Sequence, residues 1–243
     1  MGRKLFRIYY LITVLLSYFT VYPKLRKYLK DANKYFYNLL KVRIIIARRS
    51  SKLSNIKFQM NEIEAIDWSK TYILCPNHTS NLDIPAMLLS IPQPFVFIGK
   101  KELLDNPVTH NFFKATDIPL DRKSKISSFK AFKKAAEFLD KNISVLIFPE
   151  GKIGDNYPPE LTDFKSGPFK LAIQKKVPIL PIVIQNAWEL CWDDGAKHGM
   201  KSGKIQIDFL SPIDTHNLEE SDATHLKNQT YELIQKHWEL YQN

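Results

Sequence analysis

After Arg49, short apolar runs alternate with longer amphipathic stretches along the chain. The apolar runs are predicted to be strands at residues 71–75, 95–98, 118–120, 143–148, 179–184 and 204–210. The run at 143–148 (ISVLIF) is almost free of polar residues, as expected of a strand that is covered on both faces. Alternation of strands and helices predicts an α/β domain at residues 51–243, in which helices flank a layered mixed sheet.

Two longer stretches have the spacing of amphipathic helices. Residues 124–141 are expected to begin at an N-cap, Ser124, and to bury one apolar stripe while their lysines point elsewhere. That stripe consists of Ile126, Phe129, Phe132, Ala136 and Leu139. Residues 218–240 predict a closing helix, with Leu226, Leu233 and either Trp238 or Leu240 directed inward.

The first fifty residues follow a different pattern. Residues 8–22 carry no charge and are flanked on both sides by Lys and Arg, while residues 34–49 form a basic amphipathic helix. Fifteen helical residues extend roughly 22 Å, against a hydrocarbon core of about 30 Å. The first segment is therefore suited to shallow insertion and borderline for a full span. No small-x-small cleavage site follows it, so we expect it to be retained.

Charge is concentrated in this N-terminal part. The net charge is +10, and residues 1–52 hold thirteen Lys and Arg against a single acid, Asp31. This favours attachment to an anionic phospholipid membrane. The long uncharged run argues against a nucleic-acid partner. We therefore predict that residues 1–50 are a membrane-associated two-helix segment at the cytoplasmic face, either peripheral or a single short span. An ordinary core helix with a solvated face is the alternative for residues 34–49.

The clearest candidate for chemistry is NHTSNLD, residues 77–83, directly after the predicted strand at 71–75. His78 and Asp83 can meet if the histidine lies in the strand-to-helix turn and the aspartate in the first helical turn, where Pro85 is tolerated. A carboxylate on one imidazole nitrogen leaves the other as a base. On spacing alone, the stronger explanation is structural: Ser80 and Asp83 form a capping box and His78 is a satisfied loop histidine.

Charged residues also follow other predicted strands. In an α/β sheet such strand ends are where ligands bind, although each cluster alone is typical of a solvated loop or a tight turn. The candidates are Lys100, Lys101, Arg122, Glu150, Gly151 and Lys152. The two cysteines and the remaining histidines show no metal-ligand spacing, so we expect no metal site.

Several motifs together resemble one family. NHTSNLD, GKKEL (99–103), IPLDR (118–122), FPEG (148–151), FKSGPFKLA (164–172) and VPILP (177–181) occur in this order over nearly half of the chain. The set is similar to the glycerolipid acyltransferases of the 1-acylglycerol-3-phosphate acyltransferase type. The sequence departs from the family pattern at Lys152-Ile153, where Thr-Arg is usual, and at Thr116, where Gly is usual.

The resemblance implies an O-acyltransferase in which His78, oriented by Asp83, is the general base. The donor would be acyl-CoA or acyl-carrier protein and the acceptor a lysophospholipid, with no further cofactor. Arg122, helped by Lys100, Lys101 and Lys152, would hold the acceptor phosphate, while Glu150 and Gly151 would shape the acceptor pocket. Two alternatives stay open: the same reaction on another lysolipid, and a non-catalytic lipid-binding protein at the membrane surface.

Overall fold

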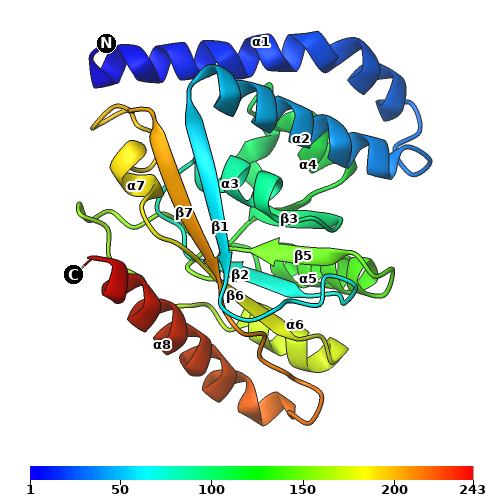
Figure 1. Ribbon diagram of the computed structural model, residues 1–243. Helices are drawn as coiled ribbons and strands as arrows, with labels where there is room; N and C mark the ends of the chain where they lie inside the picture. The colour runs from blue at the N-terminus through cyan, green and yellow to red at the C-terminus, as the bar shows by residue number, and fades with distance from the viewer. Residues whose placement is uncertain (243) are drawn as a thin grey trace.

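The computed structural model describes residues 1–242, and in them a seven-stranded sheet has helices on both faces (Figure 1). The strand order is β1-β7-β6-β2-β5-β3-β4. Neighbouring strands are parallel except for the antiparallel pair β6–β7. The predicted layered, mixed α/β sheet is therefore confirmed. The strands are β1 (Ile56–Glu62), β2 (Ile73–Pro76), β3 (Phe95–Lys100), β4 (Ile118–Leu120), β5 (Ser144–Ile147), β6 (Ile179–Ile184) and β7 (Gly203–Phe209).

The helices form two layers. Side chains of α2 and α3 belong to the hydrophobic core on one face of the sheet, and those of α5, α6 and α8 to the core on the other face. The α-helices are α1 (Arg3–Leu29), α2 (Phe36–Leu53), α3 (Asp83–Ser90), α4 (His110–Ala115), α5 (Lys125–Leu139), α6 (Gly167–Lys175), α7 (Ala187–Leu190) and α8 (Ala223–Gln242). Two 3-10 turns, Lys101–Leu104 and Glu220–Asp222, complete the elements.

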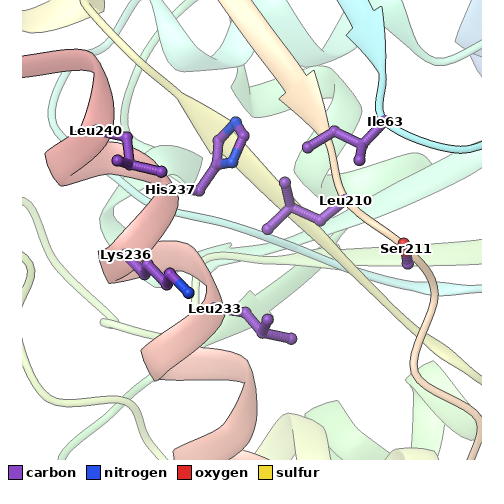
Figure 2. A pocket seen from close by; sticks show the side chains of 7 residues that line it. All are labelled: Ile63, Leu210, Ser211, Leu233, Lys236, His237 and Leu240. Atoms are coloured by element: carbon purple, nitrogen blue, oxygen red, sulfur yellow. The ribbon is translucent and has the colours of Figure 1, made fainter.

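The closing helix α8 buries Leu226 and Trp238 as predicted, but Leu233 and Leu240 do not point inward. These two side chains are 39% and 68% exposed. Together with Ile63 and Leu210 they line a shallow groove of about 190 Å³ between α8 and the sheet (Figure 2). The groove explains the exposure, because the end of α8 lies beside the rim of the sheet and has no second layer to cover it.

The predicted apolar stripe of α5 is wrong at its first turns. Ser124 is the N-cap and accepts a hydrogen bond from the Ser127 amide, as expected. However, Ile126 and Phe129 are 69% and 72% exposed. Leu139 is buried as predicted, and Phe132 and Ala136 pack half-buried against the core. The other fully buried side chains of α5 are small ones on the neighbouring face, Ala131 and Ala135. The adjoining edge strand β4 is only three residues long, so no layer covers the start of α5.

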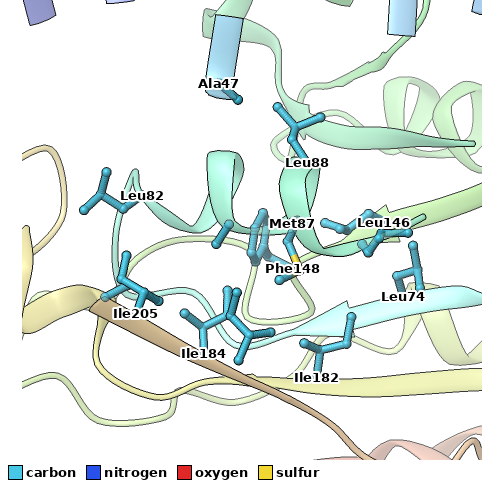
Figure 3. Close-up of a cluster of buried hydrophobic side chains, with 14 of the residues drawn as sticks. Ala47, Leu74, Leu82, Met87, Leu88, Leu146, Phe148, Ile182, Ile184 and Ile205 are labelled. Atoms are coloured by element: carbon cyan, nitrogen blue, oxygen red, sulfur yellow. The ribbon is translucent and has the colours of Figure 1, made fainter. Parts of the chain in front are cut away.

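The second N-terminal helix turns its apolar side toward protein. Ala47 of α2 belongs to the same core as α3 and the sheet, and Figure 3 shows it above Leu88 and Met87 of α3. Arg43 of α2 is buried and forms a salt bridge with Asp117 at 2.5 Å. These contacts fit the core-helix alternative for residues 34–49. The predicted domain boundary near residue 50 stays a prediction.

Helix α1 differs from α2 because much of its apolar surface is uncovered. Val21 and Leu25 pack against α2, whereas a long row of large apolar side chains is between 38% and 63% exposed. That row, the exposed α1 face, consists of Leu5, Ile8, Tyr9, Leu11, Ile12, Leu15, Leu16, Phe19 and Tyr22. By length and composition, α1 is the one helix within residues 1–242 that is long and apolar enough to cross a membrane.

Candidate active site

The topology brings the predicted site residues to one edge of the sheet. Strands β2, β5, β3 and β4 are adjacent and parallel, so their carboxyl ends lie side by side. His78 follows β2, residues 150–152 follow β5, Lys100 and Lys101 stand at the end of β3, and Arg122 follows β4. In open α/β sheets this edge is where ligands bind.

His78 and Asp83 meet in the turn between β2 and α3. The Nδ1 atom of His78 lies 2.9 Å from Oδ2 of Asp83, whose side chain is fully buried. The amides of Thr79 and Ser80 donate to the same oxygen at 2.8 and 2.9 Å. An acceptor-only carboxylate at Nδ1 keeps the proton on that nitrogen and leaves Nε2 with its lone pair. The side chain of His78 stays 15% exposed.

The histidine ring is also fixed by an aromatic neighbour. Phe148 stacks on it with centroids 3.9 Å apart and planes 18° from parallel. Phe148 is the first residue of the FPEG motif and is itself buried. Sequence reasoning treated this phenylalanine as the end of a strand and missed its contact with the ring. The adjacency of β2 and β5 creates that contact, and the sequence does not reveal which strands are adjacent.

Glu150 holds the backbone of the same turn. One of its carboxylate oxygens accepts the His78 amide at 2.7 Å, and the other accepts the amide and hydroxyl of Thr162, each at 2.9 Å. Burial raises the pKa of the Glu150 carboxyl above its ordinary value, although the hydrogen bonds from Thr162 and His78 act in the opposite direction. Glu150 is thus a buried acceptor that ties together His78 and the loop after β5.

Asn77 anchors the start of the turn, a role that sequence reasoning missed. Its side-chain oxygen accepts the Ile184 amide at 2.7 Å, and its side-chain nitrogen donates to the Ile184 carbonyl at 3.1 Å. The end of β2 is thereby fixed to the end of β6. Because Asn77 is fully buried, this pairing satisfies polar groups that would otherwise be costly.

The FPEG turn brings Arg122 next to Gly151. Gly151 has φ +80°, and a Cβ placed on it would lie 3.9 Å from Nε of Arg122. Glycine adopts this left-handed conformation without steric cost, so the turn is tight and the arginine can approach it. Arg122 is exposed and is therefore accessible to an anionic ligand.

Two of the three candidate lysines already form ion pairs outside the His78–Asp83 contact. Lys101 is paired with Asp121 at 2.6 Å and Lys152 with Asp155 at 2.5 Å, so both already have an anionic partner. Lys100 is exposed at the end of β3. In residues 1–242 no group of three or more His, Cys, Asp or Glu side chains could hold a metal ion.

The segment 189–200 contacts the turn that carries His78. Asp193 pairs with that turn as a short parallel bridge: its amide donates to the Thr79 carbonyl at 3.1 Å, and its carbonyl accepts the Asn81 amide at 2.8 Å. Asn81 and Thr79 lie on either side of Ser80, one of the amides that hold Asp83. These backbone contacts therefore help to position the turn that carries His78 and Asp83.

Helix α1 in turn holds the segment 189–200. Arg3 donates to the carbonyls of His198 and Glu189 at 3.0 and 2.9 Å, and its own carbonyl accepts the Met200 amide at 2.9 Å. Gly199 packs so closely that a Cβ on it would lie 2.6 Å from the Arg3 carbonyl carbon. Consecutive contacts thus connect the start of α1 to the turn that carries His78.

Comparison with known proteins agrees with this geometry. Residues 57–185 match the family profile described as Acyltransferase. The chain is 31% identical to an uncharacterized acyltransferase of Schizosaccharomyces pombe, over 74% of this chain and 65% of that protein. It is 27% identical to 1-acyl-sn-glycerol-3-phosphate acyltransferase alpha of Mus musculus, over 76% and 64% of the two chains. For the 1-acyl-sn-glycerol-3-phosphate acyltransferase of Cocos nucifera the identity is 30%, over 72% and 56%.

These matches differ in how much of each protein they include. The chain spans between 56% and 65% of the length of these three relatives. The fold matches the crystal structure of the 1-acyl-sn-glycerophosphate acyltransferase PlsC from Thermotoga maritima over 98% of both chains, with a TM-score of 0.74 and 22% identity.

Proposed function

The chain belongs to the acyltransferase family, and from that premise we propose that it transfers a fatty acyl group from a thioester to the free hydroxyl of 1-acylglycerol-3-phosphate, giving phosphatidate. The observation that carries the proposal is the 2.9 Å contact between Nδ1 of His78 and the buried carboxylate of Asp83, which leaves Nε2 unoccupied at the ligand-binding edge of the sheet. The names of the similar proteins supply the acceptor.

In the proposed reaction, one group, Nε2 of His78, both accepts and returns the proton. Nε2 of His78 removes the proton of the acceptor hydroxyl as its oxygen attacks the thioester carbonyl carbon. The tetrahedral intermediate then collapses, breaking the carbon–sulfur bond, and the thiolate takes the proton from Nε2. Positioned base catalysis of this kind contributes about 10²–10⁴-fold. Asp83 keeps the proton on Nδ1 throughout and stabilises the transient imidazolium.

Arg122 is our candidate for binding the acceptor phosphate. Its guanidinium can form two parallel hydrogen bonds with phosphate oxygens. It lies beside the FPEG turn, and its strand β4 is two positions from β5 and three positions from β2 in the sheet. Lys101 and Lys152 are already paired with aspartates, so Arg122 and the exposed Lys100 are the cations left available to a phosphate.

We further propose that the exposed α1 face attaches the protein to a membrane. A contiguous row of large apolar side chains in water is unfavourable, and insertion of the row into the headgroup and acyl region removes that cost. Arg and Lys flank the row, as anionic lipid headgroups would favour. Attachment at the cytoplasmic face would give access both to a lipid acceptor and to a water-soluble thioester.

A second acceptor is supported by one observation. The position after Gly151 holds Lys152, and its ammonium is engaged with Asp155. A lysolipid whose head group carries less negative charge than a phosphomonoester would need fewer cations there. The same acyl transfer to such a lysolipid is therefore our second candidate.

The proposal is tested by thiol release from acyl-CoA and from acyl-carrier protein, with purified protein and a panel of lysolipids. We expect release that depends on 1-acylglycerol-3-phosphate, and a drop of at least about 100-fold in His78→Ala. The exposed His110→Ala is the matched control. Release with a different lysolipid alone would favour the second candidate, and no release with any pair would refute the enzyme and leave the non-catalytic lipid-binding alternative.

Attachment is tested on the exposed α1 face without removing the helix. The double variant with Leu16→Asn and Phe19→Asn should cosediment less with vesicles of anionic phospholipid, because it removes apolar side chains from the exposed α1 face. Both side chains are more than half exposed and contribute little to the folded core, so the variant should still fold. Unchanged cosedimentation of this variant would show that attachment lies elsewhere.

A further inference from the structure

A groove beside the edge strand β4 is not used by the proposed mechanism. It lies between β4 and α5 and has a volume of about 500 Å³, within the range of roughly 300–1,000 Å³ that small-molecule pockets occupy. Because β4 ends the sheet, the groove is open to solvent along its length. Its polar lining includes Ser124, Ser127, Lys130 and Lys134, and its apolar lining Pro119 and Ile126.

The polar side of the groove carries positive charge and hydroxyl donors. Residues 122–134 contain six Lys and Arg and no Asp or Glu, and no lining residue is acidic. The Ser127 hydroxyl oxygen accepts the Asp121 amide, and the Ser124 oxygen accepts the Ser127 amide, so each hydroxyl hydrogen remains free to donate. This set of groups suits a ligand with several anionic oxygens.

The apolar side of the groove is unusual for a charged surface. Ile126 is 69% exposed, and Phe129, one helical turn further along, is 72% exposed. Large apolar side chains this open to water are stabilised when a ligand covers them. Phe129 lies outside the groove lining, so the apolar surface inside the groove is aliphatic. Aliphatic surface beside ammonium groups is complementary to a nucleotide, because the base is flat and apolar on its faces and the phosphates are anionic.

The separation of β4 from β2 within the sheet is compatible with the length of a thioester donor. Strand β4 is three positions from β2 in the sheet, which corresponds to about 14 Å at the usual strand spacing. In acyl-CoA, the pantetheine arm separates the thioester from the nucleotide diphosphate by a comparable length. The groove lies on the α5 face of the sheet and the His78 ring on the opposite, α3 face, so the arm would pass around the carboxyl ends of the strands to bring the thioester to Nε2 of His78.

We propose that the groove between β4 and α5 binds the phosphorylated nucleotide end of acyl-CoA, with Lys130, Lys134 and the two serines on the phosphates and Ile126 against the base. This rests on the proposed acyl transfer and specifies its donor. The concave shape and small volume favour a nucleotide over the broad surface of an acidic carrier protein.

The proposal is tested with Lys130→Glu, because Lys130 is exposed and its replacement leaves the core intact. In micelles of uncharged detergent, we expect the KM for acyl-CoA to rise at least about tenfold, since charge reversal repels the phosphates. The KM for an N-acetylcysteamine thioester of the same fatty acid, which lacks the nucleotide, should change less than about twofold. The matched control is Lys133→Glu, an exposed lysine of α5 outside the groove lining.

Three results would overturn the groove as a CoA site: an equal effect of Lys133→Glu, an equal effect on the short thioester, or an effect on acyl-carrier protein alone. Calorimetry with CoA itself separates this proposal from the catalytic one. Binding to the wild type that weakens at least about tenfold in Lys130→Glu supports the groove even if no acyl transfer is detected. Equal binding by both proteins refutes the groove whatever the activity.

Discussion

The turns after β2 and β5 each bring a buried carboxylate to His78, and the two carboxylates contact different parts of that residue. Asp83, after β2, accepts from the ring nitrogen Nδ1, whereas Glu150, after β5, accepts from the backbone amide. Only the contact of Asp83 bears on which ring nitrogen carries the proton. The contact of Glu150 fixes where the residue sits. The two acids are similarly buried but have different roles in the proposed site: Asp83 acts on the protonation of the ring, and Glu150 fixes the position of the residue.

The difference in role between Asp83 and Glu150 is tested most strongly by Asp83→Asn. The amide keeps the size of the carboxylate but can present its NH₂ group to Nδ1, which favours the wrong tautomer and removes the charge that stabilises imidazolium. We expect kcat to fall by about 10³-fold with the KM of both substrates within about threefold. Steady-state thiol release measures both constants. Exposed Asp163→Asn serves as control, and a kcat within tenfold of the wild type would contradict the role of Asp83.

Replacement of Glu150 by Gln should have a smaller effect on turnover and a clear effect on stability. Glutamine has one acceptor oxygen, so either the His78 amide or the Thr162 donors lose their partner inside the protein. A buried donor left unpaired costs about 1–3 kcal/mol. We expect that loss in urea unfolding at pH 7, together with a decrease of about tenfold in kcat as the turn loosens.

The control for this variant is Glu160→Gln, an exposed glutamate in the same loop. A kcat for Glu150→Gln as low as that of Asp83→Asn would show that the two acids do not divide their roles. Unchanged stability would show that the three hydrogen bonds of Glu150 are dispensable.

The smallest effect is a pH dependence of stability. Burial raises the pKa of Glu150 in the folded protein, so its contribution to stability is fully present below its unfolded pKa of about 4.5 and decreases as the pH rises through the folded value. Glu150→Gln lacks this titration. The stability advantage of the wild type over this variant should therefore be larger at pH 4 than at pH 7, as measured by urea unfolding at both values. An advantage that grows with pH would contradict the sign of the shift.

Much of the sheet could be predicted because its strands are apolar on both faces. The runs at 118–120 and 179–184 coincide with β4 and β6, and most of the other predicted strands differ from the observed ones only at their ends. Strand β1 was not predicted, although Ile56, Phe58 and Met60 alternate with polar residues as in a strand; the run is short and most of its residues are exposed. Its place beside β7 is set by pairing between segments about 147 residues apart.

Periodicity shows that a side chain is apolar but not what covers it. Helix α2 buries its apolar face against protein, and α1 leaves its own face open, although both read as basic segments with apolar runs. The same ambiguity produced the wrong orientation of Ile126 and Phe129 on α5.

Local motifs likewise predict only part of the candidate site. The contact between His78 and Asp83 follows from one turn and could be anticipated. The stacking of Phe148 and the acceptor role of Glu150 depend on which strands lie side by side.

The contacts of Arg3 have a practical consequence for anyone who shortens this chain to obtain a soluble enzyme. Its guanidinium and carbonyl hold the segment 189–200, and that segment pairs with the backbone on both sides of Ser80. A truncated protein would lose this support along with the proposed lipid attachment, and its measured rate would understate the rate of the intact enzyme. Intrinsic rates are therefore best determined on the full chain reconstituted in lipid.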